Sequence, residues 1–417
     1  MIRKEYSRKK LLNPHGKHMS GKMGVSELAD SADIVIVGGG CVGCSVAFNA
    51  AKLQQGLRII LVERQHVGWG TTGKSTAIVR QHYSNPVTAE MALESLKVFE
   101  NFPQQVGGDA GFKRTGFVLA VGPGDLDSLK KNVDMQRKIG IETSIVEPGE
   151  LEKLQPGANV KDIAAAAFEP RSGYADPAAT TKSFAEAAEK LGVEIVERTR
   201  VLKILSSGGK VKGVRTESGE IIGERVVNAT NVWASQVMPE GHSKLPIRVL
   251  REQNCMFVRP REFTTTLTVW GDFLNGIYFR PEGNDRLVVG SLESNLPELD
   301  DPDYCEGVDY ETVMSYSQKL FNRFPAMAQG RWERGWSGPY DVTPDWHPIL
   351  DESPEIKGLY IAAGFSGHGF KLSPVVGQLM AQLIVNGKKH PDLTIFSANR
   401  FREGKLVTSQ YESNILA

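Results

Sequence analysis

The sequence is poor in cysteine and has no excess of charge of either sign. Its 417 residues include four cysteines, Cys41, Cys44, Cys255 and Cys305, whose irregular spacing fits neither a disulfide framework nor a four-thiolate zinc site. Lys and Arg together number 49, as do Asp and Glu, so the basic excess that proteins use to bind nucleic acid is missing. We therefore expect an intracellular protein, cytoplasmic or, in a eukaryote, in the mitochondrial matrix, with no metal site and no nucleic-acid partner.

Long hydrophobic runs are missing as well. No stretch approaches the roughly 18 apolar residues of a membrane span, and the N-terminus lacks the apolar segment of a secretory signal. Residues 1–24 instead carry seven lysines or arginines and one acidic residue, which is typical of a disordered segment. We expect no transmembrane segment, a flexible basic tail over 1–31 and, at about 150 residues per domain, two or three domains after it.

Strand and helix signals recur at the two ends of the sequence. Residues 33–38 predict a buried strand, 42–55 a helix and 58–63 a second strand, which together make a right-handed βαβ unit. Another apolar strand, a glycine-rich turn and a helix lie within 358–387, and strand-like segments fill much of the middle. We therefore predict an α/β fold of two domains. Its parts are a discontinuous nucleotide-binding domain (32–86, 148–240 and 336–395), a β-rich substrate domain (87–147 and 241–335) and a C-terminal extension (396–417).

The segment from Gly38 to Gly43 has the Rossmann pattern Gly-x-Gly-x-x-Gly between the first strand and the first helix. In this setting the three glycines give a tight turn, close approach of the backbone to a pyrophosphate, and tight packing of the helix on the strand. The helix N-terminus offers its N–H groups to the diphosphate. Glu63, 20 residues after Gly43, can accept hydrogen bonds from the adenosine ribose. The pattern predicts a bound dinucleotide without a 2′-phosphate.

Two neighbouring motifs have simpler interpretations. Residues 68–75 match the phosphate-loop pattern Gly-x-x-x-x-Gly-Lys-Ser, but no apolar strand runs directly into Gly68, so we do not expect a nucleoside triphosphate there. Cys41 and Cys44 are spaced like a redox pair. Both lie inside the glycine motif, where small residues are needed, and we interpret them as packing residues.

A second glycine-rich turn lies between the last predicted strand and helix. Residues 362–377 bring Ser366, His368 and Lys371 close to the start of that helix. Backbone N–H groups and a lysine at such a position suit a flavin ring carbonyl, which gains negative charge when the flavin is reduced. We therefore predict that this turn faces the reactive ring of a flavin.

These segments resemble, in the same order, the D-amino-acid-oxidase-type family of FAD-dependent oxidoreductases, over nearly everything from Ala32 to Arg400. The segments AGFSGHGFK and PDWHPILD make the resemblance strongest to the sarcosine oxidases, both the monomeric enzyme and the β-subunit of the heterotetrameric one. The family fold that this implies is a two-domain, glutathione-reductase-like FAD-binding fold with an inserted mixed or antiparallel β-sheet that forms the substrate domain.

The resemblance implies oxidation of a small amino acid or N-methyl amino acid, such as sarcosine, glycine or proline. A hydride would pass from the C–H beside nitrogen to flavin N5, and the imine would then be hydrolysed. Two alternatives stay open: an FAD-dependent 2-hydroxy-acid dehydrogenase, and a flavin-bearing partner or assembly subunit. The electron acceptor and the choice between homo- and hetero-oligomer stay open with them.

The resemblance also assigns roles to single residues. Arg80 matches the arginine that holds the substrate carboxylate, a role that suits the bidentate fork of a guanidinium, and Lys371 matches the lysine beside it. The other catalytic candidates are Tyr340, Tyr278, Arg280 and His368. The cofactor-binding candidates are Gly38, Gly40, Cys41, Val42, Gly43, Glu63, Arg64, Thr71, Thr72, Lys74, Ser75, Val201, Ala229, Thr230, Trp233, Gly338, Gly364, Gly367, His368, Gly369, Phe370 and Lys371.

Three positions depart from the family pattern. Gly338 stands where monomeric sarcosine oxidases attach FAD to a cysteine, and Lys74 follows the Thr-Thr pair where dimethylglycine-type dehydrogenases use a histidine. We therefore predict that FAD is bound without a covalent link. Asn231 stands where the family has glycine after Ala229 and Thr230, and the sequence gives no reason for this change.

Overall fold

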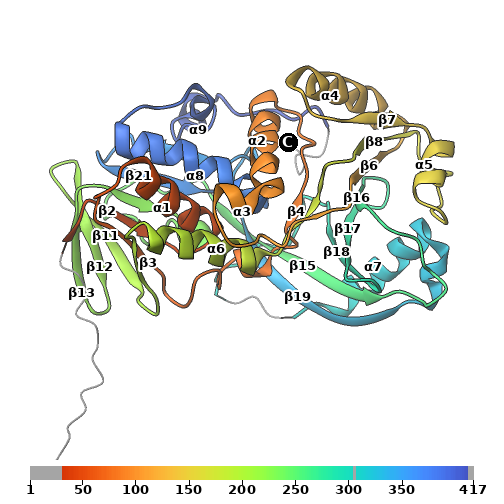
Figure 1. Ribbon diagram of the computed structural model, residues 1–417, viewed down its shortest axis with the longest axis horizontal. Coiled ribbons are helices and arrows are strands. Elements are labelled where there is room, and N and C mark those ends of the chain that lie inside the picture. Colours follow the sequence, from red (N-terminus) through yellow and green to blue (C-terminus); the bar gives the residue numbers. More distant parts are fainter. Residues whose placement is uncertain (1–30, 304–306, 412–417) are drawn as a thin grey trace, which may run out of the picture.

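The computed structural model describes residues 31–303 and 307–411, so the predictions made for 1–30 and 412–417 lie outside the described residues. The described chain forms two lobes, each built on a β-sheet (Figure 1). Two long paired strands, β15 (Arg248–Val258) and β19 (Arg331–Val342), run along the second lobe and reach the first. The lobes therefore meet beside these strands.

The first lobe is centred on a six-stranded sheet. Its order is β10 (Glu194–Val196), β3 (Ile59–Val62), β2 (Ile34–Val37), β14 (Val226–Asn228), β21 (Leu359–Ala363) and β20 (Ile349–Glu352). All pairs are parallel except the one between β20 and β21. Along β2, Ile34 and Ile36 enter the core beneath the helices, whereas Val35 and Val37 enter the core on the opposite face. Both faces are buried, which explains the continuous apolar runs in the sequence.

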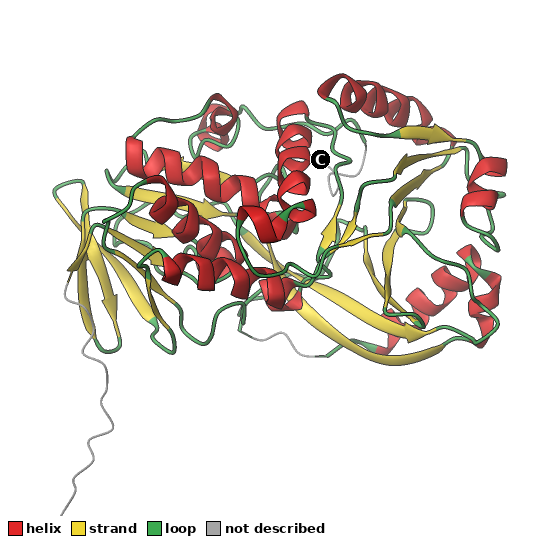
Figure 2. Cartoon of the chain, in the orientation of Figure 1, coloured by secondary structure: helices red, strands yellow, loops and turns green. Residues whose placement is uncertain are grey.

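Helices cover one face of this sheet, and a second sheet covers the other. Helix α1 (Cys41–Leu53) packs against α6 (Pro177–Lys190) and α8 (Gly369–Asn386), and α2 (Pro86–Glu100) packs on α8 (Figures 1 and 2). The covering sheet has the order β1 (Ser31–Ala32), β13 (Gly219–Gly223), β12 (Lys210–Thr216) and β11 (Val201–Ser207). Ser31, predicted in the flexible tail, therefore belongs to a strand.

The second lobe is built on an eight-stranded mixed sheet. Its order is β19, β15, β18 (Arg286–Ser291), β17 (Ile277–Glu282), β16 (Val269–Asp272), β6 (Phe117–Val121), β8 (Ala165–Glu169) and β7 (Ser144–Val146). Helices α5 (Pro148–Leu154) and α7 (Tyr310–Arg323) pack on one face, and α4 (Leu126–Ile139) packs on the other.

Short elements complete the described chain. A three-stranded sheet has the order β4 (Ile78–Val79), β9 (Gly173–Tyr174) and β5 (Lys113–Arg114). The remaining helices are α3 (Phe102–Gln105), α9 (Arg400–Glu403), and the 3₁₀ turns η1 (Thr72–Lys74), η2 (Pro123–Asp125), η3 (Asn231–Trp233), η4 (Pro325–Gln329) and η5 (Pro391–Thr394).

The division into lobes corrects the predicted domain limits. Residues 336–342, predicted in the nucleotide-binding domain, belong to strand β19 of the second-lobe sheet, and three other places differ as well. Helix α5 and strand β8, predicted in the nucleotide-binding domain, belong to the second lobe. Helix α2, predicted in the substrate domain, contributes to the core of the first lobe. The predicted C-terminal extension is integrated into the structure as far as it is described, because Phe396 is fully buried and Arg400 is 2% exposed. Tertiary packing, which local sequence patterns do not record, decides each of these.

Helix α8 begins at Gly369, five residues ahead of the proline at position 374. Pro374 lies inside the helix, where its missing N–H leaves the carbonyl of Phe370 without its usual partner. The Ser373 hydroxyl donates to that carbonyl at 2.8 Å. The substitute bond lets the helix extend back to Gly369, so Lys371 lies in the first helical turn.

Candidate cofactor and substrate site

Two adjoining cavities share part of their lining. The β2–β3 cavity, of about 870 Å³ including open solvent at its mouth, lies in the first lobe at the carboxyl ends of β2 and β3. The inter-lobe cavity, of about 1320 Å³ on the same measure, lies between the start of α8 and strands β15, β17 and β19. The residues that line both cavities are Gly40, Thr71, Thr72, Ala229 and Asn231. A long ligand could therefore extend from one cavity into the other.

The glycine motif shapes the wall of the β2–β3 cavity. Gly38 has φ +106°, and a Cβ there would lie 2.6 Å from the carbonyl oxygen of Ala229. A Cβ on Gly43 would collide with the carbonyl oxygen of Gly38, so this glycine lets α1 pack on β2. Gly40 lines both cavities, and a Cβ there would meet Thr72 Oγ1 at 3.0 Å. The bare backbone at Gly40 gives a diphosphate close access to the helix N-terminus.

Glu63 ends β3 in the wall of the same cavity and is 8% exposed. Its Oε2 accepts from the amide of Gly39 at 2.8 Å, and its Oε1 accepts from the amide of Gln65 at 2.9 Å. These bonds fix the carboxylate without using all of its lone pairs. A ribose hydroxyl could still donate to it.

Arg64 contacts two neighbouring indole rings in the wall of this cavity. Its guanidinium carbon is 4.7 Å from the ring centre of Trp69 and 4.0 Å from that of Trp233. Asp303 accepts from Arg64 at 2.7 Å and from the Trp233 indole at 3.0 Å. The arrangement gives the cavity a flat aromatic edge. The sequence analysis missed Trp69, although it directly precedes the Gly-Thr-Thr segment that the family resemblance rests on.

Asn231 joins the two lobes where the cavities meet. Its φ of +57° is in the left-handed region, which asparagine tolerates better than most residues, so it can replace the family glycine. In the orientation that satisfies both ends of the amide, its oxygen accepts from Thr71 Oγ1 at 2.7 Å and its NH₂ donates to Asp341 Oδ1 at 2.9 Å. Asp341 also accepts from the amide of Phe365 at 2.8 Å, and burial raises its pKa to about 7.

Cationic side chains line part of the inter-lobe cavity. Arg80 is 5% exposed, lies 4.4 Å from the ring centre of Tyr83 and donates to the carbonyl of His82. Lys371 donates to the carbonyl of Gly367 at 3.3 Å. Burial, and then the neighbouring charge of Arg80, hold the pKa of Lys371 well below its usual range. A bound carboxylate would neutralise part of this wall.

His368 precedes α8 in the wall of the same cavity. Its Nδ1 lies 3.2 Å from the Tyr83 hydroxyl, and its Nε2 has no hydrogen-bond partner within the described residues. Burial, and then the charge of Lys371, hold the pKa of His368 well below its usual range. The imidazole is therefore neutral near pH 7.

The opposite wall is aromatic and polar. Tyr340 lies beside Gly367, where a Cβ would meet the tyrosine ring at 2.9 Å. The Tyr278 hydroxyl donates to Asn254 Oδ1 at 3.0 Å and lies 3.3 Å from Glu252 Oε1. Glu252 and Asn254 line the cavity and were missed by the sequence analysis, because isolated polar residues in a strand usually mark its solvent-facing side.

Most of the predicted site residues line one or both cavities. In the β2–β3 cavity these are Gly38, Gly40, Glu63, Arg64, Thr71, Thr72, Val201, Ala229, Thr230 and Trp233. In the inter-lobe cavity they are Gly40, Cys41, Val42, Thr71, Thr72, Lys74, Ser75, Arg80, Ala229, Tyr278, Gly338, Tyr340, Gly367, His368, Gly369, Phe370 and Lys371. Lys74 packs against Gly338, where a Cβ would lie 3.1 Å from the lysine Cβ.

Three predicted residues line neither cavity. Gly43 acts through helix packing, and Gly364 forms a turn at φ +74°. Arg280, predicted as catalytic, donates to the carbonyl of Thr76 at 2.6 Å and to its neighbour Pro281 at 2.9 Å, and its guanidinium carbon lies 4.4 Å from the ring centre of Tyr174. These contacts hold the segment that leads to Arg80. We therefore assign Arg280 a structural role, in which it holds this segment in place, instead of a contact with the substrate.

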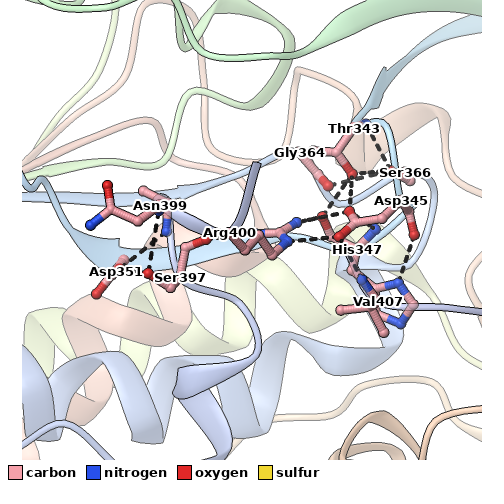
Figure 3. Close-up of polar contacts among 11 residues, drawn as sticks. Thr343, Asp345, His347, Asp351, Gly364, Ser366, Ser397, Asn399, Arg400 and Val407 are labelled. Carbon is pink, nitrogen blue, oxygen red and sulfur yellow. Dashed lines mark hydrogen bonds and ion pairs between the residues drawn. The ribbon is translucent and has the colours of Figure 1, made fainter. Parts of the chain in front are cut away.

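A buried ion pair fixes the turn that precedes α8. The Arg400 guanidinium donates to both carboxylate oxygens of Asp345, at 2.7 and 2.9 Å, and to the carbonyl of His347 at 2.7 Å (Figure 3). Thr343 donates from its hydroxyl to Asp345 at 3.2 Å and from its amide to Ser366 Oγ, also at 3.2 Å. The network connects α9 to the turn at Ser366, which leads to His368 in the wall of the inter-lobe cavity.

Two further structural features bear on function. Within 31–303 and 307–411, no helix is both long and apolar enough to cross a membrane. The same residues contain no group of three or more His, Cys, Asp or Glu side chains placed to hold a metal ion.

Comparison with known proteins places the chain in a family. The profile described as "DAO: FAD dependent oxidoreductase" matches residues 33–383. Mitochondrial sarcosine dehydrogenase of Homo sapiens is 28% identical over 387 residues, covering 90% of this chain and 42% of that protein, so the chain spans less than half of this relative. Sarcosine oxidase subunit beta of Rhodobacter capsulatus is 25% identical, with 92% of each chain covered.

A solved structure agrees with this placement. The L-proline dehydrogenase of P. horikoshii has a TM-score of 0.83 and 29% identity, covering 91% of this chain and 100% of that one. The glycine turn at the N-terminus of α1, the adjacent Glu63 carboxylate and the two adjoining cavities fit FAD. The protein belongs to the DAO family of FAD-dependent oxidoreductases, with an FAD-binding lobe and a β-sheet substrate lobe.

Proposed function

We propose that the protein oxidises a small amino acid or N-methyl amino acid, of the size of glycine, sarcosine or proline, with FAD bound non-covalently. The observation that carries the proposal is the position of Arg80 and Lys371 in a cavity that shares lining residues with the β2–β3 cavity. A carboxylate bound there would hold the rest of a small substrate near the start of α8. Gly338 and Lys74 at the two attachment positions support a non-covalent cofactor.

FAD, when bound, supplies the acceptor for the hydride that leaves the C–H beside the substrate nitrogen. The protein's own part is binding and orientation. Arg80 binds the carboxylate through its planar fork. Burial and the charge of Arg80 hold the pKa of Lys371 well below its usual range, so this amine releases its proton more readily than an exposed lysine. Ile78, Phe117 and Leu292 give the cavity apolar surface, which limits water around the reacting carbon.

The relatives support the reaction class and leave room for a second protein. Sarcosine dehydrogenase, sarcosine oxidase and L-proline dehydrogenase are each named for the oxidation of an amino acid. The relative from Rhodobacter capsulatus is by name one subunit of an enzyme. The proposal therefore includes a separate electron acceptor or a partner subunit.

An anaerobic substrate panel tests the proposal. The holoenzyme is mixed with glycine, sarcosine, N-methylated and larger amino acids, proline, and their 2-hydroxy-acid counterparts, and the loss of visible flavin absorbance is followed. Rapid bleaching by one or more amino acids supports the proposal. Bleaching by hydroxy acids alone would make the protein a 2-hydroxy-acid dehydrogenase. No bleaching by any member would favour a subunit in which flavin chemistry is secondary.

A further inference from the structure

Glu252 is a buried carboxyl group in the inter-lobe cavity that the proposed mechanism does not use. It lies on β15, is 0% exposed to solvent and lines the cavity with Arg80. The ladder between β15 and β18 covers Cys255 to Val258 of β15, so Glu252 lies before its first pair. There the Glu252 side chain, in place of a backbone carbonyl, accepts a hydrogen bond from β18. Its Oε1 accepts from the amide of Ser291 at 2.8 Å.

The second carboxylate oxygen of Glu252 is unused. Oε2 is buried and has no hydrogen-bond partner among the described residues. An unpaired buried polar atom costs about 1–3 kcal/mol, so a retained one calls for an explanation. Glu252 also lines the inter-lobe cavity, so a ligand that reaches Oε2 there would supply the missing donor.

The neighbours of Glu252 are uncharged or already paired. The Tyr278 hydroxyl lies 3.3 Å from Oε1, and Gly290 leaves room for its phenol, since a Cβ there would overlap the tyrosine oxygen. Burial raises the pKa of Tyr278, Tyr340, Tyr316 and Cys255 above their usual values, so all four stay neutral between pH 6 and 9. The other acid nearby is Glu293, which pairs with Lys319 at 2.6 Å.

We propose that Glu252 binds the nitrogen of the substrate, so that Arg80 and Glu252 together select amino acids over carboxylic acids without an amine. The inference rests on the proposed function and adds the group that recognises the amine. The substrate ammonium would donate to Oε2, and a secondary amine such as an N-methyl amino acid would still have an N–H to donate. Without a ligand, burial raises the pKa of Glu252 to about 8.

This assignment predicts a pH dependence for the wild-type protein. Below pH 8 the free carboxyl group is protonated, so binding an ammonium next to it requires release of one proton. Affinity for the amino acid should therefore rise by about tenfold per pH unit from pH 6 to 8 and then level off. Asp341, whose pKa burial raises to about 7, and Lys371, whose pKa is lowered, also line the cavity, but they act on any carboxylate ligand. An amine-free isostere of the amino acid has the same carboxylate, so the ratio of the two affinities removes the effects of Asp341 and Lys371 and leaves that of Glu252.

The experiment uses holoenzyme and three matched ligand pairs: glycine with propionate, sarcosine with butyrate, and proline with cyclopentanecarboxylate. In each pair a carbon replaces the nitrogen. Binding is followed anaerobically by the change in the flavin spectrum, with stopped-flow mixing for amino acids that also reduce the flavin. Glu252→Gln should weaken binding of the best amino acid at least tenfold and change binding of its isostere less than twofold. Glu333→Gln is the control, because Glu333 lies on β19, pairs with Arg286 at 2.7 Å and does not line the cavity.

The outcomes separate this inference from the proposed function. If amino acids reduce the flavin but Glu252→Gln weakens both members of a pair equally, the inference fails and the function stands. If no amino acid reduces the flavin, the function fails, and the affinity ratios still decide whether Glu252 recognises an amine. If the variant does not retain FAD, the test is made on the wild-type protein. An amino-acid to isostere affinity ratio that stays constant from pH 6 to 8 would overturn the inference.

Discussion

Replacing Arg80 tests the carboxylate anchor. The guanidinium is nearly buried and stacks on Tyr83, and its bond to the carbonyl of His82 uses one of five N–H donors. The donors that remain can form the fork that binds a carboxylate. Arg80→Ala would leave the bound anion without its partner in a largely dry cavity, and Arg80→Lys would keep the charge but lose the fork.

The expected loss is large because the pair is desolvated. Truncating one member of a buried, hydrogen-bonded charge pair costs about 2–5 kcal/mol. At about 1.4 kcal/mol per factor of ten, kcat/KM for a carboxylate substrate should fall by roughly 30-fold to 4000-fold in Arg80→Ala. Arg80→Lys should lose less. An amine without a carboxylate never uses the anchor and should be nearly unaffected.

The assay is the rate of anaerobic flavin reduction at increasing substrate concentration. FAD content is measured first for each variant, so that lost cofactor is not mistaken for lost anchoring. Arg286→Ala serves as the control, because that arginine is only partly buried on β18 and pairs with Glu333 outside the cavity. Equal losses on the carboxylate substrate and on the amine without a carboxylate would refute the assignment of Arg80.

The other predictions concern the cofactor and the scaffold. Acid or heat should release the yellow colour into the supernatant, because Gly338 and Lys74 occupy the two attachment positions, and colour retained in the precipitate would contradict this. Glu63→Ala should raise the Kd of FAD for the apoprotein, at a cost of about 1–3 kcal/mol; an unchanged Kd would mean that the ribose binds elsewhere. Arg400→Met should lower the free energy of unfolding by about 3–5 kcal/mol, because it leaves the buried Asp345 carboxylate unpaired; an unchanged Tm would refute this. Burial alone would raise the pKa of Asp345, but Arg400 holds it below its usual value, so this stabilisation is present above about pH 4 and is lost as the pH falls through the lowered pKa.

The sequence predicts best the elements whose patterns are local. Strands β2 and β3 are apolar runs between turns, and the glycines at 38–43 match a known turn, so the nucleotide half of the site could be predicted. Arg280 shows the limit of this reasoning. It lies two residues from Tyr278 on the same strand, but its longer side chain reaches Thr76 instead of the cavity.

Features that depend on distant contacts could not be predicted. Glu252 is buried only because β15 and β18 separate beside it, and the sequence does not record where two strands stop pairing. Asn231 has a role only once the chain places Thr71 and Asp341 on either side of it. Helix α2 has an amphipathic pattern that would fit either lobe, and its packing on α8 decides which one it joins.

The parallel sheet of the first lobe also has a consequence for folding kinetics. Strand β14 pairs with β2 on one side and β21 on the other, so residues 34–37, 226–228 and 359–363 must meet before the sheet is complete. Such long loop closures make folding slow and leave strand edges unpaired in the meantime. A ligand that binds only the completed fold shifts the equilibrium toward it. Expression under riboflavin limitation should therefore reduce the yield of soluble protein, and supplying FAD during refolding should raise the recovered fraction.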